Sequence, residues 1–112
     1  MMIKHIVFWN IKPEVNGETK EQIMLRIKEM LEALNGEIPG LLHAEVGINK
    51  NQKAGAYDIC LYSEFPDWDS LAFYQDHPKH VACKGYIGAV AENRAVCDYE
   101  VSNSQWLKPP EG

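Results

Sequence analysis

The residues best suited to chemistry lie in one short stretch, residues 74–80, which reads Tyr-Gln-Asp-His-Pro-Lys-His. An imidazole with an unperturbed pKa of about 6.5 accepts or donates a proton near neutral pH. A nearby phenol, such as that of Tyr74, can hold a carbonyl oxygen while a histidine removes an adjacent proton. The stretch is therefore compatible with proton abstraction next to a carbonyl.

The same residues also suit structural roles. At the end of a helix, His77 favours the helix dipole or caps the last carbonyls. Tyr74 can pack in the core with its hydroxyl in water. Spacing alone therefore leaves catalysis and structure open.

A metal site is a weaker alternative. His77 and His80 are three residues apart, but Pro78 lies between them and no third ligand has fitting spacing. Other candidate ligands would have to come from elsewhere in the fold: Asp76, His5 or His43. In their own segments, His5 suits a hydrogen-bonded core histidine and His43 a residue of the sheet surface or an interface.

A strand and a helix are predicted first. Apolar residues fall on both parities of residues 3–11, which indicates a strand covered on both faces. Thr19, with Gln22 three residues later, predicts a capping box. An amphipathic helix ending at Gly36 follows, with apolar positions at Ile23, Ile27, Met30, Leu31 and Leu34.

The remaining elements alternate between strand and helix patterns. Residues 42–49 and 57–64 alternate with period two and predict an antiparallel hairpin, and residues 95–101 predict the last strand. Between them, Pro66 and Asp67 open a helix with a packing stripe at Trp68, Leu71 and Ala72.

Pro78 interrupts this second helix. The helix should then end near Asp76 or His77, and Pro78 suits the first turn of a new helix that runs towards Glu92. Residues 102–112 form a polar tail, which either leaves the domain or docks through Trp106.

This order is β-α-β-β-α-β, a ferredoxin-like α+β fold with a four-stranded antiparallel sheet. The helices can cover one face of that sheet. The other face, on which the first strand places apolar residues, needs a partner. The most economical prediction is a homodimer joined sheet to sheet.

Composition excludes several classes of protein. The chain has 112 residues and a net charge of −5, which indicates one globular domain without a basic surface. Nucleic acid and membrane are therefore not expected partners. Three widely spaced cysteines predict reduced thiols packed as small hydrophobes. With no signal peptide, a cytoplasmic location is expected.

The motifs together resemble those of the stress-responsive A/B barrel (Dabb) family. The resemblance covers about residues 2–101, in the family's order. It rests on Met2-Ile3-Lys4-His5-Ile6-Val7-Phe8-Trp9, Lys12-Pro13-Glu14, Ile38-Pro39-Gly40, Glu45-Val46-Gly47, Tyr57-Asp58, Phe65, Tyr74-Gln75-x-His77-Pro78-x-His80-Val81 and Asp98-Tyr99. It implies a Dabb domain at residues 2–101 whose sheets pair into a dimeric α/β barrel.

The resemblance also implies site residues. A related plant polyketide cyclase closes a linear poly-β-ketone by aldol condensation with a Tyr and the second His of this stretch. Those positions are Tyr74 and His80 here, and the first-strand histidine corresponds to His5. His80 is thus expected as general base, Tyr74 as carbonyl anchor, and His5 and His77 as substrate-binding residues.

Three functions remain as hypotheses. The first is a homodimeric barrel of unsettled activity that binds a small apolar or aromatic metabolite. The second is a cofactor-independent cyclase or lyase that uses His80 and Tyr74. The third, a cofactor-free monooxygenase or haem-degrading enzyme, rests on analogy of fold. We expect no metal and no cofactor.

Overall fold

The computed structural model describes residues 1–101 of the chain. Its elements are β1 (Met2–Ile11), β2 (Glu14–Val15), β3 (Glu18–Thr19), α1 (Lys20–Glu32), β4 (His43–Ile48), β5 (Ile59–Phe65), α2 (Trp68–Asp76), α3 (Pro78–Val90) and β6 (Ala91–Val101). The predicted polar tail at residues 102–112, with Trp106, lies outside the described residues. None of these helices combines the length and the apolar run that a membrane crossing requires.

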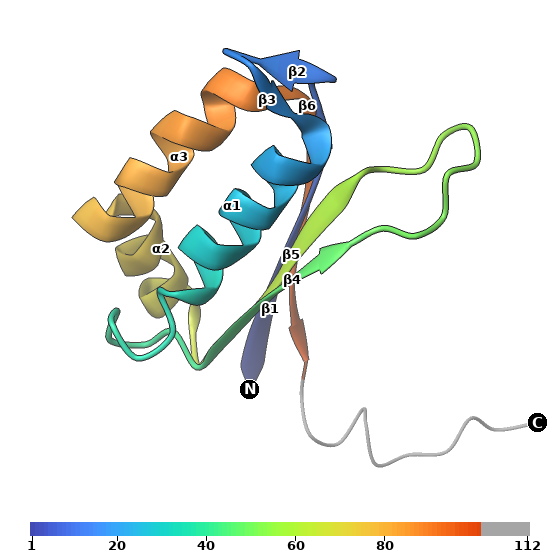
Figure 1. Ribbon diagram of the computed structural model, residues 1–112. Coiled ribbons are helices and arrows are strands. Elements are labelled where there is room, and N and C mark those ends of the chain that lie inside the picture. The colour runs from blue at the N-terminus through green and yellow to red at the C-terminus, as the bar shows by residue number, and fades with distance from the viewer. Residues whose placement is uncertain (102–112) are drawn as a thin grey trace, which may run out of the picture.

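Four of the strands form one antiparallel sheet in the order β4-β5-β1-β6. β1 lies inside the sheet, paired with β5 on one side and with β6 on the other. In Figure 1 the three helices pack against the same face of this sheet. The predicted ferredoxin-like fold and the antiparallel hairpin, which is formed by β4 and β5, are confirmed.

The two faces of the sheet follow from the alternation along β1. Every second residue is buried beneath the helices: Ile3, His5, Val7, Trp9 and Ile11. Residues of the other parity, such as Ile6 and Phe8, are half-buried on the opposite face of the sheet, which the helices leave uncovered; this is called the open face. Within one chain the helices cover one face of this strand alone, so the second covered face that the sequence predicts requires a partner.

Helix α1 supplies the layer above the sheet. Ile23, Ile27 and Leu31 of its predicted apolar stripe are at most 1% exposed. The helix ends at Glu32 rather than near Gly36, so Leu34, which is also buried, lies beyond it. Met24, which the predicted stripe omits, is also buried, whereas Met30 is partly buried. The buried face of α1 therefore includes Met24 in addition to the residues that spacings of three and four predict.

A short hairpin of β2 and β3 precedes α1, where the sequence predicted capping residues alone. Asn16 and Gly17 form its two-residue turn with φ of 50° and 86°. This left-handed conformation suits an Asn-Gly pair and matches the twist of the strands. The predicted capping box is present, since the Thr19 hydroxyl accepts from the Gln22 N–H at 3.2 Å and the Gln22 side chain accepts from the Thr19 N–H at 2.9 Å.

A single residue, His77, separates α2 from α3. Pro78 occupies the first turn of α3, as predicted, and its missing N–H leaves no hydrogen bond unmade there. The Nδ1 atom of His77 accepts from the Lys79 N–H at 3.1 Å. His77 therefore ends one helix and caps the next.

The predicted packing stripe of α2 is wrong at two of its three positions. Trp68 is 44% exposed and Ala72 is also exposed, whereas Leu71 and Tyr74 are buried. Leu71 and Tyr74 are three residues apart and share the face of α2 that meets the core. The burial of Tyr74 places its ring inside the protein.

Strand β6 begins at Ala91, four residues before the predicted start. Its first residues carry no alternating pattern, but they pair with the end of β1, as in Trp9 with Arg94. β6 lies at an edge of the sheet. For Cys97 the prediction of a packed thiol is wrong, because its side chain is exposed on this edge strand, whereas Cys83 is buried in α3.

The stability of the fold is expected to depend on the buried stripe of α1. Ile27→Ala should lower the free energy of unfolding by about 2–5 kcal/mol, because it leaves a cavity against the sheet. Leu25→Ala, at a position 59% exposed on the same helix, should change it by less than about 0.5 kcal/mol. Urea unfolding at one protein concentration measures both, and equal effects would contradict the assigned face.

Candidate functional site

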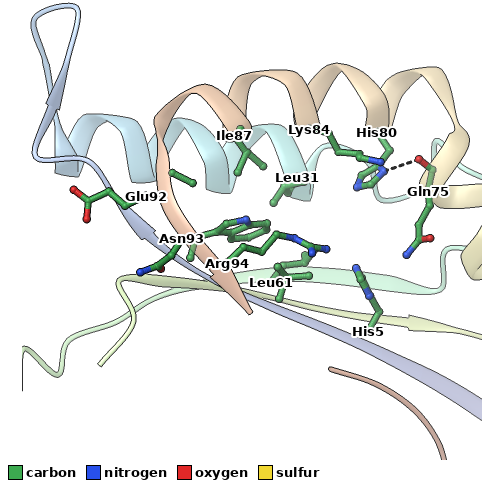
Figure 2. A pocket seen from close by; sticks show the side chains of 14 residues that line it. His5, Leu31, Leu61, Gln75, His80, Lys84, Ile87, Glu92, Asn93 and Arg94 are labelled. Atoms are coloured by element: carbon green, nitrogen blue, oxygen red, sulfur yellow. Dashed lines mark hydrogen bonds between the residues drawn. The ribbon is translucent and has the colours of Figure 1, made fainter. Parts of the chain in front are cut away.

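A cavity of about 450 Å³ lies between the sheet and α3. Its apolar wall comes from β1, β5, α1 and α3, and consists of Val7, Trp9, Leu31, Leu61 and Ile87. Figure 2 shows His5, Gln75 and His80 together at one end of the cavity. An apolar cavity of this size with a few convergent polar groups is typical of small-molecule sites.

His5 reaches this cavity from the inner strand β1 and is 3% exposed. Its Nδ1 donates to the carboxylate of Asp98, which lies opposite it in the β1–β6 register. On the other side, the buried Ser63 hydroxyl donates to the His5 carbonyl at 3.0 Å. The prediction of a hydrogen-bonded core histidine is confirmed, and the bond to Asp98 turns Nε2 away from that carboxylate.

His80 reaches the cavity from the first turns of α3 and is 8% exposed. Its Nδ1 donates to the backbone carbonyl of Gln75 at 3.3 Å, as Figure 2 shows. Burial, with smaller contributions from the positive charges of Lys84 and Arg94, lowers the pKa of His80 to about 4. The ring is therefore neutral at pH 7, with Nε2 as a hydrogen-bond acceptor.

Tyr74 lies behind His80 and does not line the cavity. Its ring is 4.1 Å from the His80 ring and 5.0 Å from the Phe65 ring, centre to centre, and it is fully buried. Burial raises the pKa of its phenol. The structure thus brings the predicted Tyr74–His80 pair together, but within the described residues the Tyr74 hydroxyl has no hydrogen-bond partner.

The structure places His77 outside the cavity. It contacts Phe73 edge to face, with 5.8 Å between ring centres, and caps α3 as described. His43 is also remote from the cavity, on β4, where it is hydrogen-bonded to Glu45 at 2.7 Å. No group of three potential metal-ligating side chains occurs within residues 1–101.

Four residues of the site were absent from the sequence-based candidates. Asp98 orients His5, Gln75 holds His80 through its carbonyl, and Lys84 and Arg94 line the cavity. Asp98 was identified as part of a family motif, but its role depends on the β1–β6 register. No pattern in the sequence marks Lys84 or Arg94, since either could face solvent.

The chain belongs to the family described as the Stress responsive A/B Barrel Domain, Dabb, whose model matches residues 3–101. This confirms the family that the motifs predicted. A comparison with the curated proteins finds no match.

Solved structures of similar proteins share the fold. A protein from Bacteroides fragilis, described as dimeric, ferredoxin-like and of unknown function, is 40% identical, with 89% of this chain and 96% of that chain covered and a TM-score of 0.79. Similar descriptions apply to proteins from Jannaschia sp. (28% identical, 90% and 100% covered, TM-score 0.74) and Thermobifida fusca (26%, 90% and 92%, 0.77). All three of these proteins are described as dimeric and of unknown function.

The lowered pKa of His80 gives the stability of the protein a pH dependence. The unfolded chain takes up this proton near pH 6.5, but the folded protein does so near pH 4. The free energy of unfolding should therefore fall as the pH drops through this window, by at most about 1.4 kcal/mol per pH unit from this group.

Urea unfolding of the wild type and His80→Gln between pH 7 and pH 4 measures this contribution. The wild type should lose stability relative to the variant as the pH falls. His77→Asn, which keeps a capping side chain, serves as the control and should follow the wild type. Parallel curves for the wild type and His80→Gln would contradict burial of a neutral ring.

Proposed function

We propose that this protein is a homodimeric barrel that binds a small metabolite with an apolar or aromatic body in the cavity beneath α3. The observation that carries the proposal is the convergence of two oriented imidazoles, His5 and His80, on one end of a cavity of about 450 Å³ whose wall carries five large apolar side chains. Each ring has its Nδ1 held by the protein, and each Nε2 is left for a ligand.

Binding is better supported than cyclisation. A cyclase of the predicted kind needs a base near the working pH and a phenol that touches the substrate carbonyl. His80, with a pKa of about 4, is a weak base, and Tyr74 lies behind it rather than on the cavity wall. In residues 1–101 no observation favours the monooxygenase alternative. A cytoplasmic location stays a prediction from the sequence.

The proposed homodimer uses the open face of the sheet. Ile6 and Phe8 of β1 and Tyr62 of β5 lie half-buried on this face, and Tyr99 of β6 is 41% exposed there. A second copy would cover these apolar side chains and would leave the cavity, on the helix side, accessible. The dimeric relatives support this assembly.

A variant that fills the cavity tests ligand binding. Gly88 lines the cavity in α3, and a side chain built there meets no atom within 4 Å at its Cβ. Gly88→Phe should weaken binding of neutral 2-naphthamide by at least about tenfold, or about 1.4 kcal/mol, because the phenyl ring would occupy space that the ligand needs. Replacement of a helical glycine should also preserve or raise stability.

Binding is followed by the backbone amide shifts of the cavity residues in NMR titrations. Gly85→Phe, on the same helix but outside the cavity wall, is the matched control and should bind like the wild type. The absence of saturable shifts around Leu61 and Ile87 in the wild type would overturn the proposal. Equal affinity of the wild type and Gly88→Phe would place the ligand elsewhere.

A charge on the open face tests the dimer. Ile6→Lys should raise the dimer dissociation constant at least about a hundredfold, because a buried charge without a partner costs about 3–5 kcal/mol. Leu25→Lys, on the helix side, should leave the constant unchanged. Sedimentation equilibrium measures both, with circular dichroism as the check on folding. A wild-type protein that stays monomeric at high concentration would overturn the assembly.

A further inference from the structure

Two basic side chains of the cavity have no acidic partner. Lys84 on α3 and Arg94 on β6 both line it, and within residues 1–101 neither forms an ion pair or a side-chain hydrogen bond. Glu92 is the acidic residue of the cavity wall. In Figure 2 its carboxylate lies at the end of the cavity opposite His80.

The other basic residues in the described helices and strands are all paired with carboxylates. These pairs are Lys4–Glu64 at 4.0 Å, Lys20–Asp58 at 3.2 Å, Arg26–Glu18, Lys28–Glu32 at 2.7 Å and Lys79–Glu37 at 3.4 Å. The chain has 16 acidic and 11 basic residues, so acidic partners are plentiful. Lys84 and Arg94 are thus the basic residues of these helices and strands that have no carboxylate partner within residues 1–101, and their meeting on one cavity indicates a site for a negative charge from outside the chain.

Both cations are directed to the polar end of the cavity. Figure 2 shows the Lys84 and Arg94 side chains pointing towards the region between His5 and His80. Their charges act on His80, whose pKa they lower. The carboxylate of Asp98, which lies opposite His5 in the β1–β6 register, is already bonded to that ring. The polar end therefore combines positive charge with a neutral imidazole.

We propose that the ligand of this cavity is an organic carboxylate, whose apolar body lies against the cavity wall and whose carboxylate binds Arg94 and Lys84. The inference rests on the ligand-binding function proposed above. A guanidinium presents two parallel N–H groups to a carboxylate, and an ammonium adds a second, compact charge. The free Nε2 of His80 can accept a hydrogen bond from a hydroxyl or enol next to the carboxylate.

The cavity wall favours a carboxylate on an apolar body over a phosphate ester. Five of its side chains are large and apolar (Val7, Trp9, Leu31, Leu61 and Ile87). A phosphate brings more charge and more acceptor oxygens than a carboxylate, and two cations with one neutral imidazole offer few donors to match them. An aromatic or enolic acid satisfies both the wall and the polar end.

A matched pair of probes separates charge from shape. 2-Naphthoate and neutral 2-naphthamide have nearly the same shape, and NMR titration gives the affinity of each for the full-length protein. Naphthoate should bind at least about tenfold more tightly, because hydrogen bonds to charged groups are roughly twice as strong as neutral ones.

Three variants test whether Arg94 and Lys84 cause the preference for naphthoate. Arg94→Gln and Lys84→Gln should each weaken naphthoate binding about fivefold or more and leave naphthamide binding unchanged, as expected for loss of one charge-assisted contact. Lys79→Gln, on the same helix as Lys84 but paired with Glu37 outside the cavity, should alter neither affinity. The dispersion of the amide spectrum verifies that each variant is folded.

The outcomes distinguish this inference from the function on which it rests. Equal affinities for the acid and the amide, insensitive to Arg94 and Lys84, would overturn the carboxylate assignment and leave an apolar ligand site. The same holds for a preference for naphthoate that survives both substitutions, since the charge would then be bound elsewhere. If neither probe shifts the cavity residues, the proposed binding function fails together with the inference.

Discussion

The structure depends on one constraint, the strict alternation of side chains along β1, a strand paired on both sides. Residues of one parity carry the core and place His5 in the cavity, while residues of the other parity form the open face of the sheet. A slip of one residue in register would exchange these faces, moving His5 out of the cavity and Ile6 into it. Long pairing with β5 and β6 makes such a slip costly.

The candidate site depends on the same register. His5 and Asp98 are separated by 93 residues, and they meet because the β1–β6 ladder sets them opposite each other. The β5 ladder adds Ser63, whose hydroxyl binds the His5 carbonyl. The polar end is thus assembled from three strands and the α2–α3 segment, while the apolar wall belongs to the common core.

The element order and the family were predictable because they rest on local patterns. Period-two alternation, the Thr19–Gln22 capping box and Pro78 each act within a few residues, and each is found as predicted. The failures have a different origin. The burial of Tyr74 in place of Trp68 depends on how α2 is rotated against the core, and the position of Arg94 depends on pairing with the far end of β1. Neither property is encoded in the neighbouring residues.

His77 is the one residue between α2 and α3, and the arrangement of these two helices affects the orientation of the His80 ring. Gln75, whose carbonyl accepts a hydrogen bond from the His80 ring, belongs to α2, whereas His80 belongs to α3. The backbone N–H groups of His80 and Val81 bond to the His77 carbonyl, at 3.0 and 2.9 Å, in the first turn of α3, and the His77 N–H bonds to the Tyr74 carbonyl of α2 at 3.2 Å. The orientation of the His80 imidazole is therefore linked, through its hydrogen bond to the Gln75 carbonyl, to the position of α2 relative to α3. A change in the angle between these helices would alter that hydrogen bond.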